Sequence, residues 1–208
     1  MKELEKEETK AEDEAENVMK DPNLLLEIFD GISSENPSVK FKSAKILRII
    51  SERNPQILYS RMDFFVNLLD SENNILKWIA IDVIGNLTPV DSENKFDKMF
   101  KKYYGFLSDE SMITISHVLD DSGKIAKAKP HLTKKITNEL LKIERAAPST
   151  HITQECKNIL LGKAILAFGM YYDKIENKDE VISFVKRQLH NTRNATKTKA
   201  EKFLKKFA

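Results

Sequence analysis

The chain has 208 residues and a hydrophobic content of 41%, so it is long enough for one substantial domain with its own core. Its single cysteine, Cys156, excludes an intrachain disulfide and a two-cysteine metal site. The net charge of +2 hides an asymmetry, because residues 1–123 carry a net charge of −9 and residues 124–208 a net charge of +11. Each half is therefore suited to a partner of opposite charge.

Residues 1–20 are predicted to form an acidic segment that is flexible or frayed. Residues 1–17 hold eight acidic residues and three lysines without an apolar stripe, so we place this segment outside the core. The same residues are charged where a signal peptide needs an apolar region, and no run in the chain approaches the roughly 20 apolar residues of a membrane span. A cytoplasmic protein without a membrane segment is expected.

Residues 21–208 are predicted to form a single helical-repeat domain, since apolar residues recur there at helical spacing. Asp21 is expected to cap the first helix, with Pro22 in its first turn. The first and second helices of five successive pairs are expected at 22–32 and 39–53, 55–69 and 72–87, 96–107 and 112–126, 132–143 and 152–172, and 181–189 and 195–207. All 6 prolines fall at predicted boundaries, including Pro148 in a loop expected at 146–150, in line with their cost of about 3 kcal/mol inside a helix.

The helix expected at 72–87 is the most apolar of these. Residues Ile75, Ile79, Val83 and Leu87 fall every four positions, and Trp78 widens the stripe, so the pattern predicts an almost fully buried helix. Gly85, near its end, has counterparts further along the chain at Gly123 and Gly162. Their spacings of 38 and 39 residues lie close to the period of about 40 residues that is typical of paired-helix repeats.

The stretch DSENNILKWIAIDVIGNL, residues 70–87, resembles the second helix of a HEAT repeat. Asp70 and Asn73 would lie in the turn, Lys77 at the usual basic position, and Ala80 and Gly85 at the small positions of that motif. The resemblance implies an all-α, right-handed α-solenoid of about five HEAT-like, or armadillo-like, helix pairs. It indicates the fold far more than an activity, because the superfamily is functionally diverse.

No catalytic, cofactor or metal site is predicted. The histidines at 117, 131, 151 and 190 lack the spacing of metal ligands, and the glycines form no phosphate-binding loop. His151 and Cys156 would lie on diverging faces of one helix, and Cys156 is interpreted as a core or half-buried residue. Asp120 and Asp121 are interpreted as solvated or capping acids, since neighbours in a helix point about 100 degrees apart.

Trp78 and Asp82 lie four residues apart, so they share a helix face. This pair is similar to the tryptophan and aspartate that line the groove of HEAT-like alkylpurine DNA glycosylases. That resemblance implies that Trp78 would stack on a damaged base and that Asp82 would stabilise positive charge on the sugar. The preferred interpretation is that Trp78 packs between helices and that Asp82 lines a groove or forms a hydrogen bond.

The last 23 residues, 186–208, have a net charge of +7. They can cap the array, contact an acidic protein surface, or bind nucleic-acid phosphate, and the capping interpretation is preferred. Phe203 and Phe207 are expected on the buried face, which speaks against base stacking. The residues proposed for a partner or nucleic-acid surface are Lys77, Asp82, Lys186, Arg187, Arg193, Lys197, Lys199, Lys202 and Lys206.

The sequence therefore predicts a binding or scaffold module, not an enzyme, that holds another protein on the concave surface lined by its second helices. The alternative is a DNA-binding or alkylpurine DNA glycosylase-like repair protein that uses Trp78, Asp82 and the basic C-terminal half. Nucleic acid is thus the second candidate partner. The identity of a protein partner and the oligomeric state are not predicted.

Overall fold

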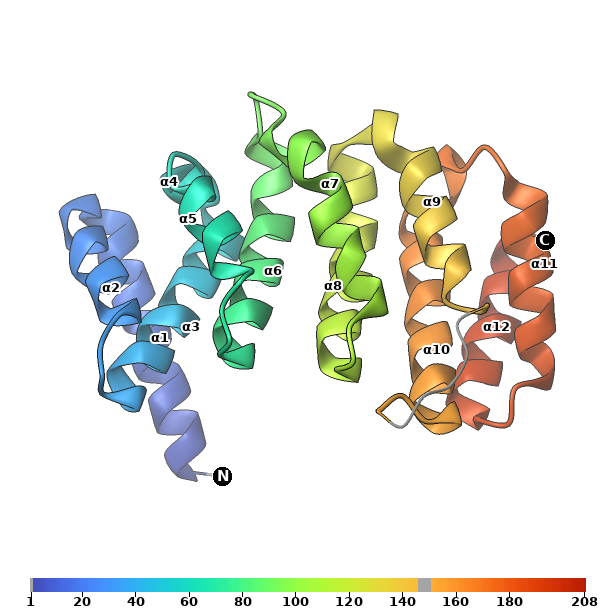
Figure 1. Ribbon diagram of the computed structural model, residues 1–208, viewed down its shortest axis with the longest axis horizontal. Helices are drawn as coiled ribbons and strands as arrows, with labels where there is room; N and C mark the ends of the chain where they lie inside the picture. The colour runs from blue at the N-terminus through green and yellow to red at the C-terminus, as the bar shows by residue number, and fades with distance from the viewer. Residues whose placement is uncertain (1, 146–150) are drawn as a thin grey trace. The chain divides into compact units, whose positions relative to one another are not determined.

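The computed structural model describes residues 2–145 and 151–208, with side chains from Lys10 onward, and every regular element in these ranges is a helix (Figure 1). The predicted all-α fold is therefore confirmed, whereas the loop expected at 146–150 lies outside the described residues. The chain divides into two compact units, 1–93 and 94–208. That residues 21–208 act as a single domain stays a prediction.

Polar caps precede three helical segments of unit 1, and the one predicted from the sequence, Asp21, is among them. Asp21 accepts a hydrogen bond from the backbone N–H of Asn23, and Asn36 and Asn73 cap the following second helices in the same way. Its elements are α1 (Lys2–Lys20), η1 (Pro22–Leu24), α2 (Leu25–Ile32), α3 (Pro37–Arg53), α4 (Gln56–Tyr59), α5 (Met62–Leu68), α6 (Asn74–Leu87) and η2 (Thr88–Val90).

Unit 2 continues the same alternation of helices and turns. Ser111 and Thr153 accept hydrogen bonds from backbone N–H groups three residues later and so cap its two longest helices. Its elements are α7 (Lys95–Gly105), η3 (Phe106–Ser108), α8 (Met112–Ala128), η4 (Pro130–Leu132), α9 (Thr133–Lys142), α10 (Gln154–Tyr171), η5 (Tyr172–Lys174), α11 (Lys178–Arg187), η6 (Gln188–His190) and α12 (Asn194–Phe207).

The helices follow the predicted pairing. The first helices are α2, α4 with α5, α7, α9 and α11, and the second helices are α3, α6, α8, α10 and α12. Second helices pack on one another within each unit: α3 on α6 in unit 1, and α8 on α10 and α10 on α12 in unit 2 (Figure 1). Stacked second helices are the basis of a helical-repeat core.

Part of the N-terminal segment belongs to the core of unit 1, and whether the segment is flexible or frayed stays a prediction. Residues 2–20 form α1, which packs against α3, and Ala11, Ala15 and Val18 are buried. Their spacing of four and three residues gives a narrow apolar stripe that the surrounding charges hide. Placing this whole segment outside the core was therefore wrong for residues 11–18. Ion pairs reinforce the contact, among them Glu16 with Arg53 at 3.3 Å.

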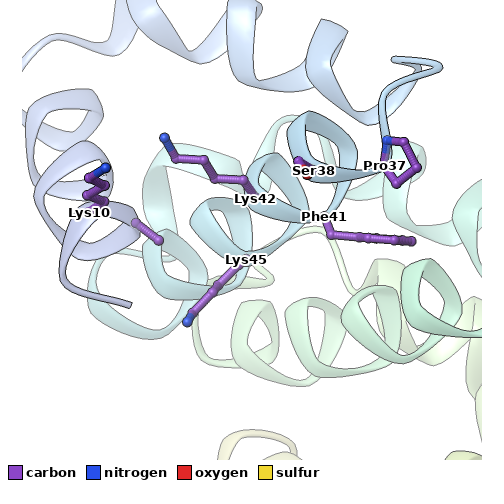
Figure 2. A pocket seen from close by; sticks show the side chains of 7 residues that line it. Lys10, Pro37, Ser38, Phe41, Lys42 and Lys45 are labelled. Atoms are coloured by element: carbon purple, nitrogen blue, oxygen red, sulfur yellow. The ribbon is translucent and has the colours of Figure 1, made fainter. Parts of the chain in front are cut away.

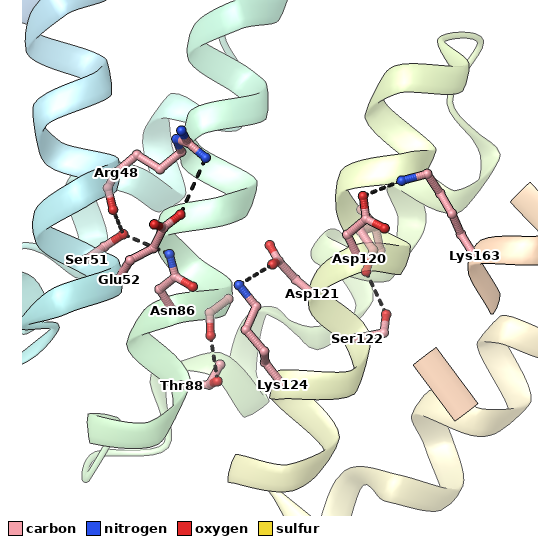
Figure 3. Close-up of polar contacts among 12 residues, drawn as sticks. Arg48, Ser51, Glu52, Asn86, Thr88, Asp120, Asp121, Ser122, Lys124 and Lys163 are labelled. Carbon is pink, nitrogen blue, oxygen red and sulfur yellow. Dashed lines mark hydrogen bonds and ion pairs between the residues drawn. The ribbon is translucent and has the colours of Figure 1, made fainter. Parts of the chain in front are cut away.

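Helix α6 is buried only in part, which corrects the prediction of near-complete burial. Residues 83–87 are buried, but Ile75 is 41% exposed and Trp78 is half-buried. An apolar run cannot by itself indicate which of its residues pack against a neighbouring helix. Asn86 donates to Ser51 Oγ at 3.0 Å, which ties α6 to α3 through a buried polar contact (Figure 3).

The single helix predicted at 55–69 is also corrected. It is two helices, α4 and α5, with a break after Tyr59.

Four tyrosines make stability sensitive to alkaline pH. Burial raises the pKa of Tyr59, Tyr104, Tyr171 and Tyr172. In the unfolded chain these phenols ionise near pH 10, whereas in the native state they keep their protons to higher pH. Stability is therefore fully present below about pH 10 and is expected to fall above it, by up to about 1.4 kcal/mol per pH unit for each tyrosine. Urea denaturation between pH 8 and 11 measures this slope.

The matched control is Tyr171→Phe. It removes one ionisable phenol while keeping the ring, and it loses the hydrogen-bonding contact with Thr137 at 3.2 Å. The variant should start from a lower stability at pH 8 but lose less with rising pH. Wild-type stability that stays constant up to pH 11 would contradict this assignment.

Candidate functional site

Helix α10 carries two large apolar side chains that face solvent. Leu166 is 52% exposed and Met170 is 39% exposed, although the rest of the helix supplies core residues such as Phe168, which is fully buried. Lys163 lies three residues before Leu166 and seven before Met170, so the three side chains follow one face of the helix. Large apolar groups on one exposed face are a feature of interaction sites.

Helix α12 carries a stripe with the same spacing, formed by Lys199, Lys202 and Lys206. The two helices run parallel, because early residues of one contact early residues of the other and late residues contact late ones. Thr196 donates to the carbonyl of Asn158 at 2.7 Å, and Gly169 lies against the rings of Phe203 and Phe207. Lys163, Leu166, Met170, Lys199, Lys202 and Lys206 together are called the α10–α12 face.

Gly162 allows α10 and α12 to approach closely at the N-terminal end of this face. A Cβ atom at this position would lie 2.8 Å from Thr196 Oγ1 and 3.4 Å from Lys199 Nζ, so the Lys199 side chain lies across the backbone of α10. The glycine period in the sequence thus has a steric reason. Burial, and then repulsion from Lys163 and Arg193, lowers the pKa of Lys199.

Helix α8 borders the other side of α10. Asp120 accepts a hydrogen bond from Lys163 (Figure 3), and a Cβ atom at Gly123 would collide with the side chain of Met170. Asp121 is not solvated as predicted, because it is 3% exposed and pairs with Lys124 at 2.6 Å. Asp120 is exposed, as expected.

Two of the predicted basic residues are held by carboxylates of their own unit. Glu144 accepts two hydrogen bonds from Arg187, at 2.9 and 2.6 Å, and these bonds raise the pKa of Arg187. Arg193 pairs with Glu155. Both arginines therefore connect one helix pair to the next. Lys186 and Lys197 are exposed and lie outside the α10–α12 face as defined.

A buried polar network that sequence reasoning missed positions α12 on α10. Asn158, which is 3% exposed, donates to Thr192 Oγ1 at 2.9 Å and accepts from Asn191 at 3.2 Å and from Gln154 at 3.0 Å. The network continues through Gln188, which donates to Glu144 at 2.8 Å. A fully bonded network of this kind fixes one arrangement of its helices.

The remaining predicted site residues, Lys77 and Asp82, belong to α6 in unit 1, where both are half-buried. They are not part of the α10–α12 face. Their role in binding stays a prediction. Trp78, which the glycosylase-like alternative pairs with Asp82, is half-buried on the same helix.

Unit 1 contains a cavity of about 480 Å³ between α1 and α3, lined by Lys10, Ala11, Pro37, Ser38, Phe41, Lys42 and Lys45 (Figure 2). Its cations do not converge on one point. Lys42 forms an ion pair with Glu14, and Lys45 points away from Lys10 and Lys42 in Figure 2. The cavity therefore makes a weaker candidate site than the α10–α12 face.

Within residues 10–145 and 151–208, no three His, Cys, Asp or Glu side chains are grouped so that they could hold a metal ion. In the same part of the chain no helix has both the length and the apolar character needed to cross a membrane. Cys156 is half-buried, in agreement with its interpretation from the sequence.

Two engineered proteins of known structure are similar to this chain. A crystal structure of an engineered protein has a TM-score of 0.57 and 12% identity, covering 92% of this chain and 81% of its own. A designed armadillo repeat protein has a TM-score of 0.56 and 12% identity, covering 94% and 87%. No protein-family model matches, and no curated protein does.

These similarities concern the fold, and they agree with the helix pairs described above. The chain has the HEAT- and armadillo-like helical-repeat fold, an all-α solenoid of stacked helix pairs, as its sequence predicted. This fold is typical of scaffolds that bind other proteins. Neither similar structure supports the DNA glycosylase alternative.

Proposed function

We propose that this protein is a protein-binding module whose partner docks on the surface formed by its second helices, which is the concave surface of a HEAT-like solenoid. The observation that carries the proposal is the exposure of Leu166 and Met170, at 52% and 39%, beside the lysine stripe of α12. An apolar centre with a polar rim is the usual anatomy of a protein interface. No catalytic step is part of the proposal.

A protein suits this face better than a nucleic acid does. Its central side chains on α10 are apolar and so offer nothing to phosphate, and Asp120 and Glu155 lie among the nearby cations. Both arginines of the region, Arg187 and Arg193, are already paired with carboxylates. Nucleic-acid sites instead favour arginines that are available for bidentate hydrogen bonds to phosphate.

The test is capture of partners from a lysate of the source cells by the wild-type chain and by the double variant Leu166→Ser, Met170→Ser. Quantitative mass spectrometry should find at least one protein reduced about tenfold or more with the double variant, because a few central apolar residues carry most of the binding energy of an interface. Both samples are treated with nuclease, so that capture through nucleic acid is removed.

Leu26→Ser is the matched control, since Leu26 is 64% exposed on α2, a first helix. It should capture the same proteins as wild type. Equal recovery of every protein by wild type and the Leu166→Ser, Met170→Ser variant would contradict the proposed docking surface. Thermal melting of each variant checks that its fold is intact.

A further inference from the structure

We propose that the α10–α12 face recognises an acidic stretch of polypeptide, in which Asp or Glu residues flank one or two apolar side chains. This inference rests on the proposed function and adds the chemistry of the docked segment. It commits to an acidic polypeptide as the occupant.

The arrangement of the two stripes carries the inference. On α10 the stripe reads Lys163, Leu166, Met170, and on α12 a stripe of the same spacing, 36 residues later, is all lysine. Because the helices are parallel and packed, with axes about 8–10 Å apart, the lysine stripe runs in the same direction as the stripe on α10. A segment lying on this face would place apolar side chains on Leu166 and Met170 and carboxylates on the lysines of α12.

Two lysines of the α12 stripe are not held by an ion pair. Within residues 10–145 and 151–208, no acidic side chain forms an ion pair with Lys199 or Lys202, whereas Lys206 lies over the ring of Phe207 at 4.8 Å. Burial, followed by repulsion from Lys163 and Arg193, lowers the pKa of the half-buried Lys199, and attraction to Asp120 offsets only part of this effect. A carboxylate from a partner would relieve that repulsion without displacing an existing ion pair.

The two aromatic rings next to this face are not available to nucleic-acid bases. Phe203 is 5% exposed, and Phe207 stacks against the ring of Tyr172 at 4.5 Å, so neither ring is placed to stack on a base. The apolar side chains of Leu166 and Met170 fit a polypeptide that carries apolar residues between its acids.

The experiment uses the full chain and a fluorescein-labelled synthetic peptide of 12 residues with six glutamates and two leucines, followed by fluorescence anisotropy. A second peptide with every glutamate replaced by glutamine is the ligand control. The acidic peptide is expected to bind at least about tenfold more tightly at low salt, and its affinity should fall with rising salt, because exposed charges are screened.

The protein variant Lys199→Gln, Lys202→Gln should weaken binding of the acidic peptide about tenfold or more and leave the glutamine peptide unaffected. The matched control is Lys135→Gln, Lys178→Gln, which removes two exposed lysines of the first helices α9 and α11 and should bind the acidic peptide as wild type does.

Three results would overturn the inference: equal affinity for the two peptides, equal loss with the control variant, or tighter binding of a labelled 12-nucleotide single strand that the Lys199→Gln, Lys202→Gln variant abolishes. Failure of the inference is distinguishable from failure of the proposed function. If Leu166→Ser, Met170→Ser still loses its protein partner while the two peptides bind alike, the docking surface stands and its acidic preference does not.

Discussion

Replacing Phe168 with alanine is expected to lower the free energy of unfolding by about 3 to 5 kcal/mol. The side chain is fully buried in the middle of α10, and its ring meets that of Phe184 edge-on at a centroid distance of 5.6 Å. Truncation would leave a cavity between α10 and α11 that the surrounding helices could fill only in part. Urea denaturation of wild type and variant measures the difference.

Leu166→Ala, two residues away on the same helix, is the matched control. Leu166 is 52% exposed, so its removal should change stability by less than about 1 kcal/mol. A loss as large as that of Phe168→Ala would mean that Leu166 belongs to the core and not to an exposed face. Together the two variants separate the packed side of α10 from its outward side.

Asn158→Ala is expected to cost about 1 to 3 kcal/mol, because the buried amide would lose three hydrogen bonds while its exposed or half-buried partners could still bond to water. The amide donates to Thr192 and accepts from Gln154 and Asn191, and all of these contacts lie at the junction of α10 with α12. Chemical denaturation should show the loss. Amide hydrogen exchange should become faster in α12, since its attachment to α10 is weakened.

The control for this variant is Asn138→Ala on α9. Asn138 is exposed, and its side chain accepts one long hydrogen bond from Asn177 at 3.5 Å. Its removal should leave both stability and exchange in α12 nearly unchanged. An Asn158→Ala variant as stable as wild type would show that the network contributes little to joining the helices.

Most helix boundaries could be predicted because they depend on local chemistry. Asp21 and Pro22 begin a helical segment through capping and a fixed backbone angle, and both effects lie within a few residues of sequence. The period of about 40 residues was visible in Gly123 and Gly162, which the structure places at close contacts between second helices. Local patterns of this kind do not depend on distant parts of the chain.

Burial depends on distant neighbours, and there the sequence was less informative. The helix at α10 was predicted, but nothing local separated Leu166, which faces solvent, from Ile165, which is buried. The same limit applies to Asp121, whose carboxylate is buried beside Lys124 although its neighbour Asp120 is exposed. In α1, the many charged residues around Ala11, Ala15 and Val18 hid the apolar stripe.

The lysines of α12 were predicted as a candidate surface, but their apolar counterpart on α10 was not. The spacing itself was visible, because Lys163, Leu166 and Met170 are spaced like Lys199, Lys202 and Lys206, which follow 36 residues later. Spacing alone did not show that Leu166 and Met170 face solvent. Arg187 and Arg193 were also predicted as surface residues, but each is paired with a carboxylate. These carboxylates lie 43 and 38 residues earlier in the chain, which is too far for a local pattern to indicate the pairing.

Site-specific photo-crosslinking tests the docking surface most directly. A photoreactive amino acid is placed either at position 166 on α10, or at position 183, an exposed residue of α11, in otherwise wild-type protein exposed to lysate. The expected result is a discrete set of polypeptides crosslinked from position 166 and few or none from position 183. Equal crosslinking from the two positions, or crosslinks from position 166 to nucleic acid alone, would contradict a protein-binding face on the second helices.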